Sequence, residues 1–125
     1  MNNIVDSSAW IEYFIGGPQR AHFRPFIHNT DDLIVPSITL FEVYKRFLVV
    51  ADETRAIEAT NQMKKGRVVE LNEYLSIWAA TLSKDLQLPM ADSIILATAY
   101  ATGATVYTMD RDFEGIEGVN YVPKN

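Results

Sequence analysis

The stretch Leu88–Ala99 (LPMADSIILATA) constrains the fold most, because as a helix it is apolar or small on nearly every side and has one charged residue, Asp92. Pro89 suits the first helical position, where no backbone N–H is needed, and Gly103 can end the helix in the left-handed conformation. A helix that is apolar all round is normally buried. The sequence therefore predicts a core helix with Asp92 in its first turn, near the positive end of the helix dipole.

Length and composition indicate one domain spanning residues 1–125, because 125 residues that are 48% hydrophobic can bury a sizeable core. No apolar run approaches the roughly 20 residues of a membrane-spanning helix. Asn2, Asn3 and Asp6 do not fit the start of a signal peptide. We therefore expect a cytoplasmic protein with no membrane association.

The residue types also limit the metal chemistry and the partners. The chain has no cysteine, and its two histidines, His22 and His28, are separated. This excludes disulfides and thiolate metal sites and makes a zinc site unfavourable, so any metal would be held by oxygen. The net charge of −5 argues against a broadly basic nucleic-acid-binding surface. Local basic patches can still contact phosphates, so net charge alone does not decide the partner.

Short apolar runs typical of strands alternate with helical patterns along the whole chain. Strands are expected at residues 3–6, 33–35, 68–71, 104–108 and 119–122, with helices at 7–14, 19–29, 37–47, 52–63, 72–86 and 89–102. Such alternation predicts an α/β fold, a three-layer sandwich with a mainly parallel central sheet and right-handed crossovers.

Four acids fall where such a sheet would form a site. Asp6 and Asp110 follow the first and fourth strands, and Glu42 and Asp92 lie in the opening turns of helices that face the same edge. Each acid alone has a simpler explanation, as a helix cap, a solvent-facing side chain or a dipole partner. Carboxylates crowded together without a cation would be costly, however. One or two divalent ions, Mg²⁺ or Mn²⁺, would relieve the repulsion and suit phosphodiester hydrolysis.

Four short motifs resemble, in order and spacing, those of the PIN-domain ribonucleases, and the single compact domain is similar to VapC-type toxins of toxin-antitoxin pairs. The motifs are Asp6–Ile11, Pro36–Glu42, Ala91–Ala97 and Thr108–Phe113. Together they extend over essentially the whole chain. The resemblance implies a PIN-like fold that hydrolyses RNA phosphodiester bonds and needs no side-chain nucleophile.

The resemblance also implies site residues and partners. The acids that correspond to the family's Mg²⁺- or Mn²⁺-binding quartet are Asp6, Glu42, Asp92 and Asp110, and Asp112 is a further acid that leaves the choice of direct ligand open between Asp110 and Asp112. Ser7 and Thr108 correspond to polar residues that support the metal site. The implied partners are an RNA substrate, a cognate antitoxin protein and a second copy of the chain in a homodimer.

Basic residues near these motifs are candidates for contacting the RNA backbone. They are Lys45 and Arg46, which follow Glu42 on its own helix, and Arg20 and Arg24 on an earlier one. Arginines placed like Arg20 and Arg24 are more often part of a solvated helix face. Lys45 and Arg46 share the side of Glu42, so they can either pair with it or border a site.

Two alternatives belong to other functional classes. A phospho-acceptor receiver domain needs an acid pair after the first strand, a lone aspartate after a mid-chain strand and a lysine after the last. The chain instead has Asp6 alone, then Glu70-Leu71-Asn72, and no such lysine. A non-catalytic PIN scaffold that only binds a partner is the other alternative, and the intact set of acids argues against it.

Overall fold

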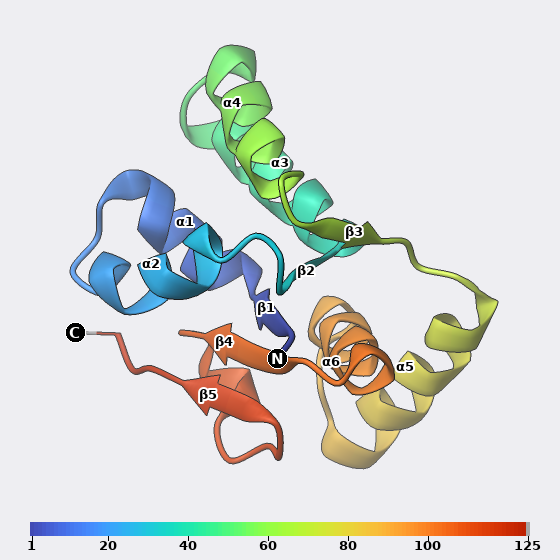
Figure 1. Ribbon diagram of the computed structural model, residues 1–125. Coiled ribbons are helices and arrows are strands. Elements are labelled where there is room, and N and C mark those ends of the chain that lie inside the picture. The colour runs from blue at the N-terminus through green and yellow to red at the C-terminus, as the bar shows by residue number, and fades with distance from the viewer. Residues whose placement is uncertain (125) are drawn as a thin grey trace.

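Five parallel strands form one central sheet in the computed structural model, which describes residues 1–124 (Figure 1). The strand order across the sheet is β3-β2-β1-β4-β5. The strands are β1 (Asn3–Val5), β2 (Leu33–Pro36), β3 (Arg67–Val69), β4 (Thr105–Thr108) and β5 (Val119–Tyr121). Every strand pair is parallel, so the carboxyl ends of all five strands lie at one edge.

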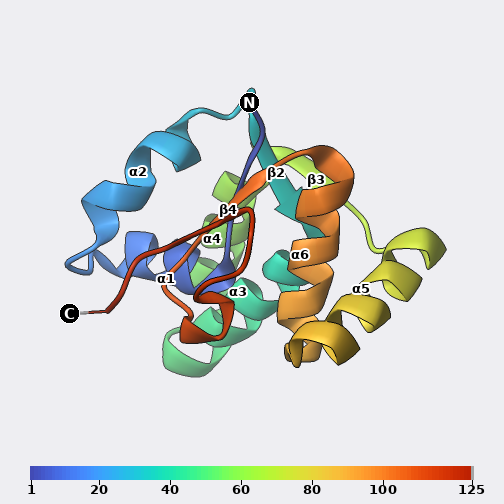
Figure 2. The ribbon, with the colours of Figure 1, turned by 90° about the horizontal axis from the view of Figure 1, so that it is seen from below.

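Helices cover both faces of this sheet. They are α1 (Ser7–Ile15), α2 (Arg20–His28), α3 (Ser37–Val50), α4 (Glu53–Met63), α5 (Glu73–Leu86) and α6 (Met90–Thr102), followed by the short 3-10 helix η1 (Arg111–Phe113). Figures 1 and 2 show α1 to α4 on one side of the strands and α5 and α6 on the other. This arrangement confirms the predicted three-layer α/β sandwich with a parallel sheet.

Alternation along β1 sends successive side chains into two separate cores. Val5 packs with the residues of α1 to α4, including Trp10 and Phe23. Ile4 packs on the other face with Ile95 of α6 and its neighbours. The strand is therefore buried on both faces, as expected for the centre of a parallel sheet.

Helix α6 is the buried helix that its apolar sequence predicts. Eight consecutive residues from Asp92 to Ala99 are buried, and Gly103 ends the helix in the left-handed conformation with φ of 65°. The helix begins at Met90, one residue later than predicted, because Pro89 has extended backbone geometry and forms the cap. No helix among residues 1–124 is long and apolar enough to cross a membrane.

Candidate metal centre

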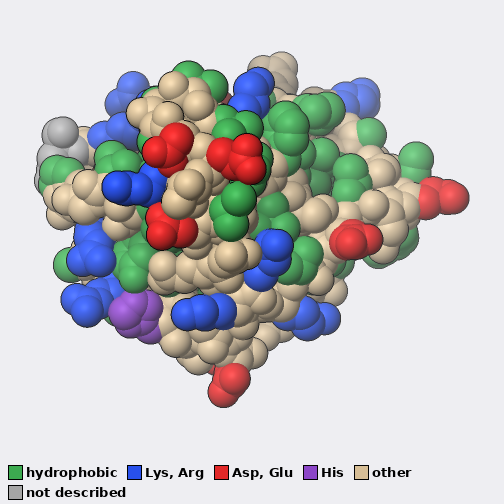
Figure 3. Space-filling model, turned by 90° about the horizontal axis from the view of Figure 1, so that it is seen from above, with side chains coloured by type: hydrophobic (Ala, Val, Ile, Leu, Met, Phe, Trp, Pro, Cys, Tyr) green, Lys and Arg blue, Asp and Glu red, His purple; other side chains and the backbone are tan. Residues whose placement is uncertain are grey.

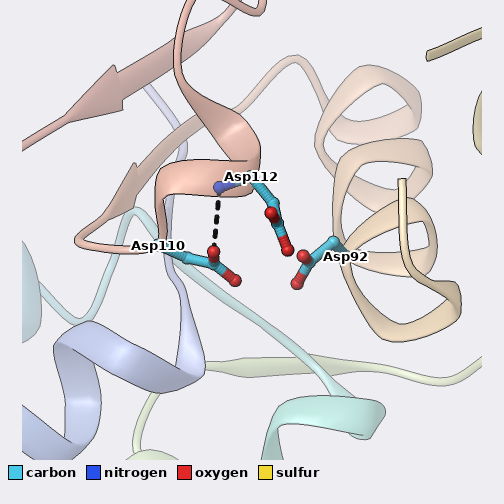
Figure 4. Close-up of side chains that lie close together, drawn as sticks. All are labelled: Asp92, Asp110 and Asp112. Atoms are coloured by element: carbon cyan, nitrogen blue, oxygen red, sulfur yellow. Dashed lines mark hydrogen bonds between the residues drawn. The ribbon is translucent and has the colours of Figure 1, made fainter. Parts of the chain in front are cut away.

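Three aspartates meet at the carboxyl edge of the sheet. Asp92 comes from the first turn of α6, Asp110 from the segment after β4, and Asp112 from η1. One carboxylate oxygen from each lies within 4.8 Å of those of the other two. Figure 4 shows the three side chains pointing toward one another across the space between η1 and α6. Residues from distant parts of the sequence thus form one compact group of oxygen donors.

The segment after β4 is held in a tight turn by its own polar groups. The Thr108 hydroxyl accepts a hydrogen bond from the Asp110 backbone N–H at 2.8 Å. The Asp110 carboxylate in turn accepts one from the Asp112 N–H at 2.9 Å, which caps η1 (Figure 4). Asp110 and Asp112 therefore lie on the same side of the turn, which brings both toward Asp92.

Asp6 lies beneath this group, directly after β1, and is only 2% exposed. Its Oδ2 accepts hydrogen bonds from the Ser8 hydroxyl at 2.9 Å and the Thr108 hydroxyl at 2.8 Å. The Ser8 hydroxyl also accepts a hydrogen bond from the Met109 N–H at 3.1 Å. These contacts fix the ends of β1 and β4 to each other, and the predicted role of Thr108 as a support is consistent with them.

Ser8 is a supporting residue that the sequence motifs do not indicate. The only available signal was its place two residues after Asp6, where a hydroxyl can reach back to a carboxylate. Ser7, which was singled out, contacts a different acid, because its hydroxyl donates to Glu42 Oε1 at 2.6 Å. Adjacent serines at the start of α1 therefore orient two different acids, Asp6 through Ser8 and Glu42 through Ser7.

Crowding and burial change the protonation of two of these acids. Burial raises the pKa of Asp6 to about 6, against the opposing effect of its hydrogen bonds, and the Glu42 charge adds to the rise. Burial also raises the pKa of Asp92 to about 8, with further contributions from the charges of Asp6, Asp110 and Asp112. The structure thus brings three of the five predicted acids together, and Asp6 and Glu42 lie outside that compact group. The charge of Asp6 acts on Asp92, and the charge of Glu42 acts on Asp6.

The donor set fits a hard divalent cation. The groups that converge are carboxylates, and within residues 1–124 none of the five acids forms an ion pair with a lysine or arginine. Burial is the main cause of the raised pKa values of Asp6 and Asp92, and the charges of neighbouring acids add to the rise. No lysine or arginine of the described residues pairs with these acids to balance their charge. A divalent ion that prefers oxygen ligands would balance it.

The predicted RNA-contacting cations lie in different surroundings. Arg46 lines a cavity of about 500 Å³ together with Ser8 and Met109. The Lys45 ammonium instead lies 5.8 Å from the centre of the Phe41 ring. Figure 3 shows basic side chains scattered over the face that carries α3 and α4, with hydrophobic and acidic ones between them. Contact with a polyanion on that face would depend on a few cations.

The two arginines of α2 also differ from each other. Arg20 donates from Nε to the Tyr13 carbonyl at 3.0 Å, and its guanidinium lies 4.8 Å from the centre of the Tyr13 ring. It therefore ties α2 to α1. Arg24 is exposed.

Comparison with known proteins identifies the family. The PIN domain profile matches residues 4–119, so the chain belongs to the PIN domain family. No curated protein matches the chain significantly. This membership agrees with the resemblance seen in the four motifs and removes the receiver-domain alternative. That alternative also has a different strand order, 2-1-3-4-5.

Solved structures share the fold at low sequence identity. A toxin-antitoxin complex from Klebsiella pneumoniae superposes with a TM-score of 0.79 at 22% identity, covering 95% of this chain and 96% of that one. DNA-bound VapBC from Salmonella typhimurium gives 0.76 at 21% identity and 98% coverage of both chains. The Mycobacterium tuberculosis toxin VapC20, described as cleaving the sarcin-ricin loop, gives 0.77 at 15% identity, covering 93% and 95%.

Proposed function

We propose that this protein is a metal-dependent endoribonuclease that acts as the toxin of a toxin-antitoxin pair. The observation that supports this most is the meeting of Asp92, Asp110 and Asp112 within 4.8 Å at the carboxyl edge of a PIN-domain sheet. The fold of the VapC20 toxin and of the two toxin-antitoxin complexes supports the same assignment.

We assign the metal ligands to Asp6, Glu42, Asp92 and Asp110, with Asp112 as a further or alternative ligand, and the metal to Mg²⁺ or Mn²⁺. A divalent ion held there would stabilise negative charge on the phosphate and make water a better nucleophile. The protein's own contribution is to hold the carboxylates in place. Thr108 and Ser8 orient Asp6, and Ser7 orients Glu42.

Besides holding the carboxylates in place, the protein controls when they lose their protons and can bind a metal. Asp92, with its pKa raised to about 8, retains its proton near neutral pH when no cation is present. Binding a cation favours the ionised form, so the site releases protons as it fills. The proposed activity is therefore expected to fall at low pH, where protons compete for the ligand oxygens.

The proposed partners follow from the same assignment. RNA is the substrate, a cognate antitoxin protein blocks the site, and the toxin pairs with a second copy of itself. Cellular RNA as substrate places the activity in the cytoplasm.

Cleavage of RNA by the purified full-length protein tests the nuclease assignment. Total cellular RNA is incubated with Mg²⁺, with Mn²⁺ or with excess EDTA, and the ends of the fragments are sequenced. Specific cleavage with either metal and none with EDTA is expected. Equal cleavage in EDTA contradicts the metal mechanism, and no cleavage of any RNA in the total pool favours the non-catalytic scaffold.

Growth measurements test the toxin assignment separately. Expression of the protein alone is expected to arrest growth of its host, and the Asp92→Asn variant is expected to have no effect. Normal growth during expression of a protein that cleaves RNA in vitro would make it a processing nuclease instead.

A further inference from the structure

Two cavities adjoin beside the acidic group and extend beyond the residues assigned to the metal site. The first, of about 500 Å³, reaches Glu12 of α1 and Arg46 of α3. The second, of about 550 Å³, reaches Asp110, Arg111 and Tyr121. Ser8, Met109 and Lys124 line both cavities, so the two form one groove that passes Asp110.

Cations lie along this groove, although the protein as a whole is acidic. Arg46 lies in the first cavity, Arg111 in the second, and Lys124 lines both. All three are exposed, and none forms an ion pair with a residue of the described part of the chain. Their charge is therefore available to a ligand in the groove.

Hydrogen bonds hold the C-terminal segment in position as one wall of the groove. The Val122 N–H donates to the Thr108 carbonyl at 2.8 Å, which extends the pairing of β5 with β4. The Gln19 side-chain amide donates to the Pro123 carbonyl at 3.3 Å. These two hydrogen bonds hold the backbone that leads into Lys124.

The buried carboxylate of Glu12 holds Gln19, the residue that contacts the C-terminal segment. Glu12 is 9% exposed and accepts a hydrogen bond from the Gln19 backbone N–H at 2.7 Å. A Cβ at Gly17 would collide with the Glu12 carboxylate, so glycine at this position lets the acid reach the α1–α2 turn. Glu12 therefore positions Gln19, and Gln19 in turn positions the C-terminal segment.

We propose that this groove binds the sugar-phosphate backbone of the RNA strand beside the bond that is cut, with Arg46 and Lys124 contacting the flanking phosphates. The inference rests on the proposed nuclease function. An anion can approach a cluster of acids only if cations offset their charge. Arg46 and Lys124 provide that charge, because both line the first cavity and Lys124 also lines the second cavity together with Asp110. Contacts of this kind position a nucleic acid without reading its sequence.

The neighbouring residue Lys45 provides a comparison within the same helix. Both side chains are exposed cations of α3. Lys45 lines a separate cavity between α3 and α4, together with Phe41 and Lys64, whereas Arg46 lines the groove. The inference therefore predicts different effects for adjacent substitutions that change the net charge by the same amount.

Binding of a short fluorescein-labelled single-stranded RNA of mixed sequence, measured by anisotropy in Mg²⁺, tests the groove. The full-length protein carries Asp92→Asn so that the probe is not cut. Arg46→Met and Lys124→Met are each expected to raise Kd about two- to fivefold, as loss of an exposed charge contact does. Each should also reduce the magnitude of the salt slope of log K by about 0.7. Lys84→Met, an exposed cation of α5, should change neither value.

Kinetics with the active protein provide a second measurement. Arg46→Met and Lys124→Met are expected to raise KM more than they lower kcat, because the contacts bind substrate and transition state alike. If the parent protein binds and cleaves RNA but neither variant differs from it, the groove assignment is wrong and the nuclease assignment stands. If the parent protein neither cleaves nor binds RNA, both the groove assignment and the nuclease assignment are contradicted.

Two further outcomes would overturn the inference alone. If Lys45→Met weakens RNA binding as much as Arg46→Met does, the effect is one of overall charge and not of the groove. If labelled polyglutamate binds more tightly than the RNA and loses affinity on Arg46→Met and Lys124→Met, the groove is a site for an acidic protein segment.

Discussion

The Thr108 hydroxyl donates a 2.8 Å hydrogen bond to the carboxylate of Asp6, although 102 residues separate the two in sequence. The same hydroxyl accepts a hydrogen bond from the Asp110 N–H. One buried side chain therefore fixes the distance between the end of β1 and the turn that presents Asp110 and Asp112. The geometry of the acidic group depends on this link.

Replacing Thr108 with valine keeps the shape of the side chain but removes both hydrogen bonds. The buried Asp6 carboxylate keeps its hydrogen bond from Ser8 but loses the one from Thr108, and the Asp110 N–H loses its partner. These losses are expected to lower the free energy of unfolding by about 1–3 kcal/mol. RNA cleavage should fall as well, because the acids lose their alignment. Urea unfolding and a cleavage assay measure the two effects.

Thr98→Val is the matched control for that substitution. Thr98 is equally buried, but its hydroxyl donates only to the Ile94 carbonyl within α6. We expect little change in cleavage from this variant. Equal loss of activity in both variants would mean that Thr108 acts on the fold in general and not on the site.

Replacing Asp92 with asparagine removes a negative charge that a hard cation needs, while its size is kept. If Asp92 is a ligand, cleavage should fall by orders of magnitude. Loss of the dipole interaction costs only about 0.3–1 kcal/mol. Asparagine opposes that loss, because it removes a carboxyl group whose ionised form is disfavoured by burial and by the charges of Asp6 and Asp110. The Tm of the metal-free protein is therefore expected to stay unchanged or rise.

Asp85→Asn, at an exposed acid of α5, serves as the control and should leave cleavage and Tm as they are. An Asp92→Asn protein that cleaves RNA normally, or that is inactive only because it has unfolded, would show that Asp92 is a structural acid at a helix N-terminus.

The metal-free protein is expected to lose stability as pH rises from about 4 to about 8. In this range the folded state holds protons on Asp6 and Asp92 that the unfolded chain has released, because their pKa values are raised from 3.8 to about 6 and about 8. The unfolded state then binds fewer protons, so the free energy of unfolding decreases with pH. Measuring Tm across this pH range in EDTA tests whether stability falls with rising pH, as expected.

Saturating Mg²⁺ or Mn²⁺ is expected to reverse this trend, because the cation binds the ionised carboxylates of the folded state. Asp92→Asn should flatten most of the slope seen in EDTA. A metal-free protein whose stability rises over the same pH range would contradict the proton uptake assigned to these two acids.

Separate substitutions of Asp110 and Asp112 test which is the direct ligand. Asn at position 110 can still accept the hydrogen bond from the Asp112 N–H, so the turn should survive Asp110→Asn. Asp110 is half-buried and Asp112 is exposed. We therefore expect Asp110→Asn to reduce Mn²⁺ affinity, measured by calorimetry, more than Asp112→Asn does. The reverse order would assign the ligand to Asp112.

Much of the fold was predictable because its signals are local. The apolar run of α6 and the short strands that precede Asp6 and Asp110 indicated a parallel sheet with acids at one edge, and the order of the elements follows that pattern. The exact ends of individual strands and helices were less predictable. Residues 68–71 were expected as a strand, but β3 ends at Val69, because it pairs only with β2 and the chain then turns toward α5.

The parts of the site that could not be predicted depend on long-range contacts. No local pattern shows that Ser7 contacts Glu42 while Ser8 contacts Asp6, since the choice depends on how α1 docks against α3. The position of Lys124 near Asp110 likewise requires β5 to pair with β4 and Gln19 to reach the C-terminal segment. Side-chain partners more than a few residues apart emerge only from the packed structure.

The central place of β1 determines when the acidic group can form during synthesis. β1 is made first, yet one of its two neighbours, β4, begins only at Thr105. Contacts between residues so far apart in sequence are expected to form late and slowly. During synthesis the nascent chain therefore contains Asp6 before it contains Asp110. The acidic group cannot be complete until the last part of the chain has been made.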